Sequence, residues 1–303
     1  MKIGIDIGGS HIATGVVEEN GKLLGKETRD INMADINDEK RAQNIIVDTI
    51  NNEIKLLIER YDYSLSDISK IGIAVPGSPT ETSIRRLVNL HINNFNIAEK
   101  LSSIYKTKIR IKNDGKCAGI AEKKYGALTG SDDCVFLCLG TGVGSAVFLN
   151  GKLLEPKQNP GFEFGHMIIQ KDGIKCNCGK KGCFETYASM KRFKSNAIKE
   201  LRLPKNIESE ELQNYIRKNI KKQNVSRYVD RYIEYVSLGV SNIINIFEPE
   251  EICFGGSFSY YSDIFLPKMA EKIKPLIFNK DTKLRLVSAK LKNDAGIIGA
   301  TEI

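Results

Sequence analysis

The segment KIGIDIGGSHIATGVVEENGKLL, residues 2–24, decides the fold class of this 303-residue chain. Residues 2–7 are rich in apolar side chains and predict a strand, Gly8-Gly9-Ser10 predicts a tight turn, and residues 12–17 predict the next strand. Asn20-Gly21 predicts a second hairpin turn, because this dipeptide favours the backbone angles that a short hairpin loop needs. The chain therefore opens with consecutive hairpins.

The same arrangement returns about 130 residues later. Residues 135–139 predict a strand, residues 140–144 a glycine turn and residues 145–149 the next strand. Residues 150–154 then read NGKLL and repeat residues 20–24 letter for letter. The equal position of the repeat after two glycine-turn hairpins favours an internal duplication over chance. Two related lobes, each with a glycine turn, indicate a nucleotide held between them.

Outside the repeat, apolar periodicity predicts alternating helices and strands. The predicted helices span residues 37–60, 97–105, 115–126, 190–221, 227–247 and 294–301, and the predicted strands span residues 70–75, 108–111 and 251–254. This alternation is typical of an α/β protein, and the chain length favours two domains of ordinary size.

Composition excludes several classes of protein. No apolar run reaches 18 residues, and an acidic residue and glycines interrupt the first strand, so we expect neither a membrane span nor a signal peptide. The expected location is the cytoplasm. The formal charge is +8, but the lysines are scattered among acidic residues. This scatter favours a solvated surface with some attraction for anionic substrates over nucleic-acid binding.

The seven cysteines fall into two groups, and their odd number argues against a disulfide framework. Cys117, Cys134, Cys138 and Cys253 have apolar neighbours, which predicts buried small side chains. The other three follow His166 within Cys176-Asn177-Cys178-Gly179-Lys180-Lys181-Gly182-Cys183. Three thiolates and one imidazole form a closed tetrahedral set for Zn²⁺, which we favour over free cysteines in a loop. Four protein ligands leave no position for water, so the ion would be structural.

The two glycine turns carry the chemistry expected of a phosphate site. Phosphate oxygens need several backbone N–H donors close together, and residues without side chains allow that approach. Gly8-Gly9-Ser10 and residues 140–144 both satisfy this need, and Ser10 and Thr141 add hydroxyl donors. Asp6 ends the first strand and is placed to hold Mg²⁺ through water. Either turn alone favours an ordinary hairpin, whereas the pair favours phosphate binding.

Asn113-Asp114 lies between a predicted strand and a predicted helix. A carboxylate there either caps the helix or acts as a general base. In the second interpretation Asp114 accepts the proton of a sugar hydroxyl during attack on phosphorus, and Asn113 hydrogen-bonds neighbouring hydroxyls.

Three polar residues are tied to the cysteine loop. Glu163 lies three residues before His166, and Glu185 lies two residues after Cys183. Each alone is consistent with a surface charge or a helix N-terminal charge. Fixed by one metal loop, they suit vicinal sugar hydroxyls, because carboxylates and imidazole accept hydrogen bonds with fixed direction.

These motifs match one known family over nearly the whole chain. They are Asp6-Ile7-Gly8-Gly9-Ser10, Val75-Pro76-Gly77, Asn89-Leu90, Leu139 to Gly144, Glu163-Phe164-Gly165-His166-Met167 with Cys176 to Glu185, and Gly255-Gly256-Ser257. On these residues the sequence resembles the ROK family (repressors, open reading frames and kinases), within the superfamily of sugar kinases, heat-shock proteins and actin.

The resemblance implies an α/β fold of the two-lobed, actin-like ATPase type, which is ribonuclease H-like, with duplicated lobes and a zinc-binding loop. Residues 1–112 with the C-terminal helix 292–303 would form the small lobe, and residues 113–291 the larger lobe with the zinc loop. It also implies MgATP as phosphoryl donor, a structural zinc ion, a sugar substrate and a homodimer or homotetramer. Neither a nucleic acid nor a membrane is an expected partner.

Carried over residue by residue, the resemblance implies that Asp114 is the catalytic base. The implied sugar contacts are Gly77, Asn89, Asn113, Asp114, Glu163, His166 and Glu185. The implied ATP contacts are Asp6, Gly8, Gly9, Ser10, Gly140, Thr141, Gly142, Val143, Gly144, Gly255 and Gly256. The implied zinc ligands are His166, Cys176, Cys178 and Cys183, with one ring nitrogen of His166 for the metal and the other for the sugar.

Some positions depart from the family pattern and leave the sugar preference open. Ser10 replaces the usual threonine, His11 stands where lysine is frequent, and Gly115-Lys116-Cys117 stands where small alanine-type residues are usual. Glucose is the first choice and N-acetylmannosamine the second. Fructose, allose, N-acetylglucosamine and β-glucosides are further alternatives, because the loops around residues 77–95 set discrimination.

Two alternatives to a kinase belong to other functional classes. Repressors of the family carry a helix-turn-helix domain before the first phosphate motif, and here that motif begins near residue 1, which favours the enzyme. The other alternative is a non-catalytic sugar sensor stabilised by zinc.

Overall fold

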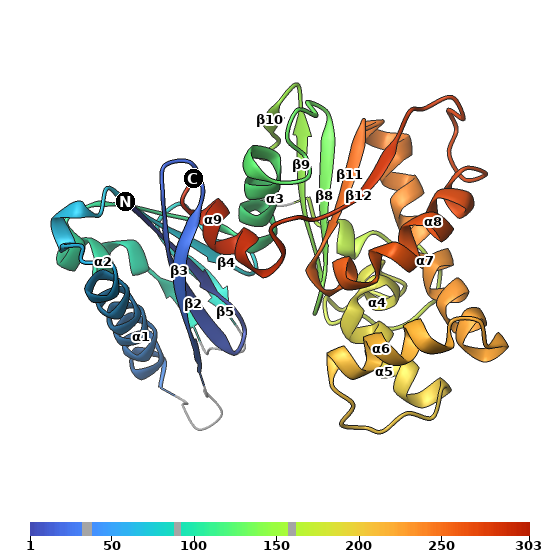
Figure 1. Cartoon of the computed structure of the whole chain (residues 1–303), viewed down its shortest axis with the longest axis horizontal. Helices are drawn as coiled ribbons and strands as arrows, with labels where there is room; N and C mark the ends of the chain where they lie inside the picture. Colours follow the sequence, from blue (N-terminus) through green and yellow to red (C-terminus); the bar gives the residue numbers. More distant parts are fainter. Residues whose placement is uncertain (32–37, 88–91, 157–161) are drawn as a thin grey trace. The chain divides into compact units, whose positions relative to one another are not determined.

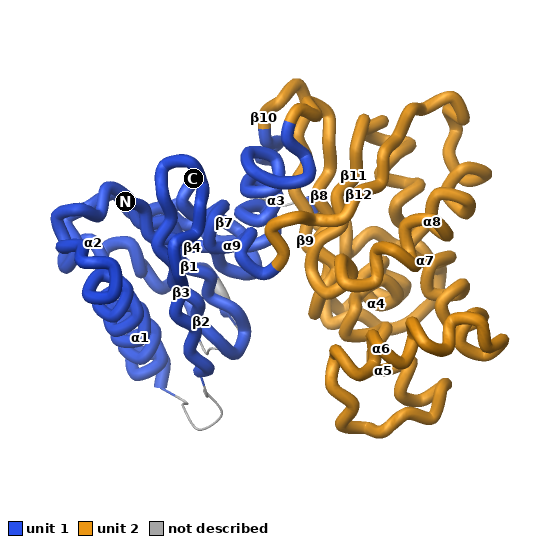
Figure 2. Tube along the Cα trace, in the orientation of Figure 1, with its two compact units in different colours: residues 1–129, 153–162, 293–303 blue, residues 130–152, 163–292 orange. Residues whose placement is uncertain are grey.

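The computed structural model describes residues 1–31, 38–87, 92–156 and 162–303. The chain divides into two compact units, coloured separately in Figure 2 and labelled by element in Figure 1. Unit 1 comprises residues 1–129, 153–162 and 293–303, and unit 2 comprises residues 130–152 and 163–292. Within the described ranges, no helix has the length and apolar character needed to cross a bilayer.

Unit 1 is built on a five-stranded mixed sheet of order β3-β2-β1-β4-β7. The first two turns of the chain join β1 to β2 and β2 to β3 as antiparallel hairpins, and β4 and β7 add parallel strands beside β1. The strands are β1 (Lys2–Ile7), β2 (His11–Val17), β3 (Leu23–Asp30), β4 (Lys70–Val75) and β7 (Lys108–Asn113), with a separate hairpin of β5 (Ile84–Leu87) and β6 (Ile92–Phe95).

Unit 2 repeats this topology, with a second sheet of order β10-β9-β8-β11-β12. Again an antiparallel hairpin is extended on one side by two parallel strands. The strands are β8 (Cys134–Leu139), β9 (Val143–Leu149), β10 (Lys152–Leu153), β11 (Glu251–Gly255) and β12 (Arg285–Ser288). The predicted duplication is therefore confirmed. The second glycine turn is shorter than predicted, because Val143 and Gly144 already pair with Leu139 and Cys138 in the β8–β9 ladder.

The sheet of unit 1 is covered on both faces. The isoleucines of β1 and β4 form the core with the apolar stripe of α1 (Glu39–Arg60) and with α2 (Ile97–Tyr105). On the other face, Gly4 and its register partner Gly72 leave room for α9 (Ala295–Ala300). A Cβ on Gly4 would lie 2.0 Å from the Ile297 carbonyl oxygen, and one on Gly72 would lie 1.6 Å from that of Ala300. The C-terminal helix thus packs directly on the first sheet.

Helix α3 (Asp114–Tyr125) also belongs to unit 1, so the boundary between the two units lies after residue 129 and not after residue 112. The reason is its close packing against α9, where a Cβ on Gly299 would lie 1.7 Å from the Cys117 carbonyl oxygen. Residues 153–162 join unit 1 as well. There Glu155 accepts from Lys112 at 2.5 Å and from the buried Lys116 at 3.5 Å.

The helices of unit 2 correct one prediction. Residues 190–221 form two helices, α5 (Met190–Glu200) and α6 (Ser209–Asn219), separated by a segment that contains Pro204. Proline lacks the N–H that a continuous helix needs there. The other helices are α4 (Glu185–Ala188), α7 (Gln223–Phe247) and α8 (Ser262–Ile273), with 3₁₀ turns η3 (Phe164–His166) and η4 (Gly256–Tyr261). Two further 3₁₀ turns, η1 (Leu65–Asp67) and η5 (Lys292–Asp294), complete the described elements.

A buried carboxyl group lies inside unit 1. Glu53 on α1 is 1% exposed and accepts a hydrogen bond of 2.5 Å from the Thr14 hydroxyl, while its Oε1 has no hydrogen-bond partner in the described structure. Burial raises the pKa of Glu53 from 4.5 to about 7. The native state therefore binds a proton that the unfolded chain releases. The contribution of Glu53 to stability is therefore fully present below pH 4.5 and is lost as pH rises through about 7.

We expect Glu53→Gln to remove this pH dependence. Ionisation of Glu53 costs the native state on the order of 3 kcal/mol above pH 7, since one pKa unit corresponds to about 1.4 kcal/mol. The stability of the variant relative to the natural chain should therefore rise between pH 5 and pH 8, as measured by urea unfolding. Glu59→Gln, an exposed position of the same helix, is the control. If the free energy of unfolding depended on pH equally in all three proteins, folding would not raise the pKa of Glu53.

Candidate functional site

The predicted site residues of unit 1 lie at one edge of its sheet. Three neighbouring parallel strands supply them: Asp6 is the last residue but one of β1, Gly77 follows β4, and Asn113 ends β7. The carboxyl ends of parallel strands share an edge, and this is where open α/β sheets bind ligands. Asn89, the remaining predicted sugar contact of this part of the chain, falls outside the described residues.

The structure separates the roles of the Asn113-Asp114 dipeptide. Asn113 is the helix cap, since its Oδ1 accepts from the Lys116 N–H at 3.1 Å. Its Nδ2 donates to the Gly77 carbonyl at 2.9 Å, which links the ends of β4 and β7. Asp114 is the first residue of α3, and its Oδ1 accepts from the Gly115 N–H at 2.8 Å. The N-cap of α3 is therefore Asn113 and not Asp114.

Asp6 lies close enough to Asp114 for their charges to interact. Burial first, and the negative charge of Asp114 second, raise the pKa of Asp6 to about 7. Gly296 on α9 faces this carboxyl group, because a Cβ there would lie 2.4 Å from its Oδ2. Two neighbouring carboxyl groups at the end of a sheet suit a divalent cation held directly or through water.

The first glycine turn is closed by His11. The Gly8 N–H donates to the His11 carbonyl at 2.8 Å, and a Cβ on Gly8 would lie 2.9 Å from the His11 ring. Gly9 and Ser10 are exposed, and the Ser10 carbonyl accepts from the Ile31 N–H at 2.8 Å. The exposed tip of the turn is thus available to a ligand.

The second glycine turn, in unit 2, contacts a residue predicted for sugar binding. The Gly140 N–H donates to the Gly142 carbonyl at 3.0 Å, and the Val143 N–H donates to Glu185 Oε2 at 3.0 Å. A Cβ on Gly142 would lie 2.5 Å from the same carboxylate oxygen. The structure therefore brings Glu185, predicted to contact the sugar, to Gly142 and Val143 of the turn predicted to bind phosphate.

Glu163 and His166 lie on either side in sequence of a segment that contacts Val143, at the end of this turn. Glu163 precedes η3, and its carbonyl accepts from the His166 N–H at 2.9 Å. Gly165, inside η3, packs against β9, since a Cβ there would lie 3.0 Å from the Val143 carbonyl oxygen. The predicted sugar contacts thus form two sets, one in each unit: Gly77, Asn113 and Asp114 in unit 1, and Glu163, His166 and Glu185 in unit 2.

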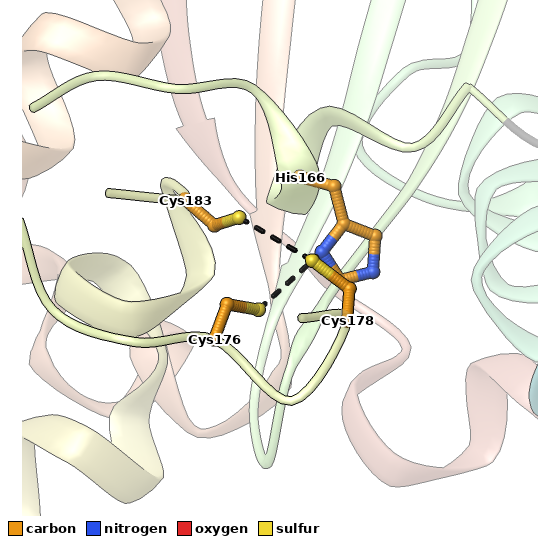
Figure 3. Close-up of side chains that lie close together, drawn as sticks. All are labelled: His166, Cys176, Cys178 and Cys183. Atoms are coloured by element: carbon orange, nitrogen blue, oxygen red, sulfur yellow. Dashed lines mark hydrogen bonds between the residues drawn. The ribbon is translucent and has the colours of Figure 1, made fainter. Parts of the chain in front are cut away.

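The predicted metal ligands converge, as Figure 3 shows. One ligand atom from each of His166, Cys176, Cys178 and Cys183 lies within 4.8 Å of every other. Sγ of Cys178 is 3.6 Å from Sγ of Cys183, and Sγ of Cys176 is 3.7 Å from Nδ1 of His166. Two sulfurs bound to tetrahedral zinc at about 2.3 Å are about 3.8 Å apart, so the spacing fits that ion.

The loop around this cluster is shaped by glycine. Gly179 and Gly182 have positive φ angles of 90° and 80°, and a Cβ on Gly182 would lie 1.8 Å from the Gln170 carbonyl oxygen. A backbone hydrogen bond from Lys180 lowers the pKa of the Cys178 thiol, as suits a thiolate ligand. None of the seven cysteines forms a disulfide, and of the four predicted to be buried, Cys138 is only half-buried.

Unit 2 also contains a cavity of about 600 Å³ that begins at the second glycine turn. Gly256, with φ of 68°, follows the neighbouring strand β11 and packs against the Leu139 carbonyl. Sequence reasoning identified Gly140, Thr141 and Gly255-Gly256 but missed the walls of the cavity, which come from α5, α6 and η4. The wall residues include Lys191, Lys194, Glu210, Gln213, Ser257 and Tyr260.

Comparison with known proteins gives matches along the whole chain. The ROK family model matches residues 2–303. The chain is 30% identical to a glucokinase of Thermotoga maritima, over 99% of this chain and 96% of the relative. It is 25% identical to the xylose repressor of Bacillus subtilis, over 99% of this chain and 76% of the repressor.

Solved structures agree with the fold. A ROK family glucokinase from Streptomyces griseus, in complex with glucose and AMPPNP, matches with a TM-score of 0.81 and 24% identity, covering 99% of this chain and 98% of that one. The repeated sheets, the glycine turns and the match along residues 2–303 lead to one conclusion: this chain belongs to the ROK family and has the actin-like fold of its sugar kinases.

Proposed function

We propose that this protein transfers the γ-phosphate of ATP to a hydroxyl group of a hexose, with glucose as the first candidate and the 6-hydroxyl as the acceptor. The chain is a sugar kinase, as its full-length similarity to a glucokinase indicates. The observation that carries the proposal is the position of Asp114. It is an acidic side chain at the ligand-binding edge of the sheet, and Asn113 performs the capping that would otherwise explain it.

Asp114 acts as the general base in this proposal. A sugar hydroxyl is a weak nucleophile, and the carboxylate accepts its proton as the new oxygen–phosphorus bond forms and the bond to the β-phosphate oxygen breaks. The Gly115 N–H donates to the carboxylate, and Asn113 caps the helix that begins with Asp114. Mg²⁺ bound with ATP would neutralise charge on the phosphates, and Asp6 would hold it through water.

The donor would be held by the two glycine turns and the cavity of unit 2. The turn residues are Gly8, Gly9 and Ser10 in unit 1 and Gly140, Thr141, Gly142, Val143 and Gly144 in unit 2. Gly255 ends β11 and Gly256 follows it, next to Ser257 of the cavity wall, and we infer that they form the turn on the nucleoside side of the site. A cavity of about 600 Å³ is within the range that small-molecule sites occupy.

The loop bearing the sugar contacts would be fixed by a structural zinc ion bound by His166, Cys176, Cys178 and Cys183. The ligand spacing supports this proposal. Because Nδ1 of His166 faces the sulfurs, its Nε2 would be the ring nitrogen left for the sugar. Glu163 and Glu185, on either side of the loop, would orient vicinal hydroxyls.

We expect purified protein with MgATP to release ADP in the presence of glucose, at a kcat/KM above that for N-acetylmannosamine. A coupled ADP assay over glucose, N-acetylmannosamine, fructose, allose, N-acetylglucosamine and a β-glucoside measures this. Higher activity with N-acetylmannosamine would replace glucose as the substrate. Release of no ADP with any member of the panel would contradict the kinase function and favour a sugar sensor.

A further inference from the structure

The backbone carbonyl of Tyr260, a residue of the cavity wall, accepts two side-chain hydrogen bonds. Its oxygen accepts a hydrogen bond of 2.6 Å from Gln213 Nε2 and another of 2.6 Å from Arg217 Nη2. Both donors come from α6, one helical turn apart, and together they use both lone pairs of the oxygen. Arg217 is held in turn by an ion pair with Asp263 at the start of α8.

This contact settles the orientation of the Gln213 amide. Only the NH₂ group of an amide donates to a carbonyl, so Nε2 must face Tyr260 and Oε1 must be the other atom of the amide. Gln213 lines the cavity, and no donor from the described part of the chain hydrogen-bonds its Oε1. Of the two polar atoms of this amide, only Oε1 is therefore left to pair with an occupant of the cavity.

The rest of the cavity suits a planar base. Tyr260, Tyr261 and Phe193 line it, and aromatic side chains pack well against flat heterocycles. Tyr261 is fixed by stacking on Phe265, with ring centroids 5.1 Å apart and planes 7° apart. Lys292 lies over the Tyr260 ring at 5.9 Å from its centroid. At its other end the cavity reaches the Gly140-Thr141 turn, where the phosphates of the donor would lie.

We propose that Gln213 is a donor-specificity residue, which accepts a hydrogen bond from the 6-amino group of adenine, and that Arg217 is the positioning residue that holds this wall. The inference rests on the proposed use of a nucleoside triphosphate as phosphoryl donor. A fixed acceptor favours an amino group and disfavours a keto oxygen at the same position, because two acceptors repel and the site is left unpaired. The donor should accordingly be ATP and not inosine or guanosine triphosphate.

The test compares ATP with inosine triphosphate, which differs at the 6-position by a keto oxygen in place of the amino group. For the natural chain we expect kcat/KM for ATP to exceed that for inosine triphosphate by about tenfold, at saturating sugar. Gln213→Met should bring the two values to within about twofold by weakening use of ATP. The KM for sugar should be unchanged in both proteins.

Arg217→Met tests whether Arg217 positions the cavity wall, apart from recognition of the base by Gln213. It should raise the KM for both nucleotides with kcat unchanged, and Arg217→Lys should restore part of the loss because lysine keeps one donor. The matched control is Arg231→Met, which breaks a comparably exposed ion pair with Glu200 elsewhere in unit 2 and should change neither KM. Unchanged nucleotide KM values in folded Arg217→Met would overturn the positioning role.

Calorimetry measures the equilibrium affinity for both nucleotides without any phosphoryl transfer. It therefore tests the specificity proposal independently of the kinase function. Equal affinity and equal use of ATP and inosine triphosphate by the natural chain would overturn it without any variant. An unchanged preference for ATP in Gln213→Met would overturn it too. A chain that prefers ATP in binding but phosphorylates no sugar would support the specificity of the cavity and contradict the proposed kinase.

Discussion

Replacing Asp114 by asparagine is expected to lower kcat for sugar phosphorylation by about two to four orders of magnitude, the range that general base catalysis contributes. Asparagine has the same shape and keeps an oxygen that accepts from the Gly115 N–H. It cannot accept the proton of the attacking hydroxyl at neutral pH. Sugar affinity should therefore stay within a few fold of the natural value, as measured by calorimetry, while turnover collapses.

The control for this variant is Asp38→Asn. Asp38 also lies at a helix N-terminus in unit 1, where it accepts a hydrogen bond of 2.7 Å from the Arg41 N–H, and asparagine is an equally good cap. Full activity is expected from it. If Asp114→Asn kept the turnover of the natural chain, the base would have to be another group, and the proposed role of the sheet edge would be wrong.

Much of the fold follows from local sequence signals. The hairpin of residues 2–24 and its repeat are strong patterns, because alternating apolar residues and glycine turns act over short distances. The carboxyl ends of β1, β4 and β7 then determine where Asp6, Gly77 and Asn113 gather. The cysteine spacing likewise predicted a cluster that the structure brings together. The hairpins and the cysteine cluster each lie within one short stretch of chain, residues 2–24 and residues 166–183.

Other features depend on contacts between distant residues. Pro204 is a local signal for the break between α5 and α6. The packing of α6 against η4 has no local signal, because it depends on side-chain hydrogen bonds to the backbone carbonyl of Tyr260. The contact of Glu185 with the Val143 N–H joins residues 42 positions apart. Strand β12 is short, and its four residues lack clear alternation of buried and exposed side chains. Tertiary packing, and not local preference, fixes these elements.

Loss of the proposed zinc ion should weaken sugar binding strongly. Metal analysis is expected to find about one zinc per chain, and Cys178→Ser should lose most of it, since a hydroxyl replaces one of four ligands. Cys178 is exposed, so the substitution itself removes little packing. The KM for sugar should rise about 10- to 100-fold, the range expected when the support of a metal site is cut, because the loop no longer fixes Glu163 and Glu185. The melting temperature should fall by several degrees.

Cys134→Ser is the control, because Cys134 is not one of the proposed zinc ligands. Cys134 lies in β8, and its thiol donates to the Ser131 carbonyl at 3.4 Å, a bond that a serine hydroxyl can also make. This variant should keep its zinc content and its KM for sugar. Comparing the two variants distinguishes loss of zinc from general loss of stability. Both variants can lose stability, but only Cys178→Ser should lose zinc together with sugar affinity. A metal-free chain with an unchanged KM for sugar would show that the loop holds Glu163 and Glu185 without zinc.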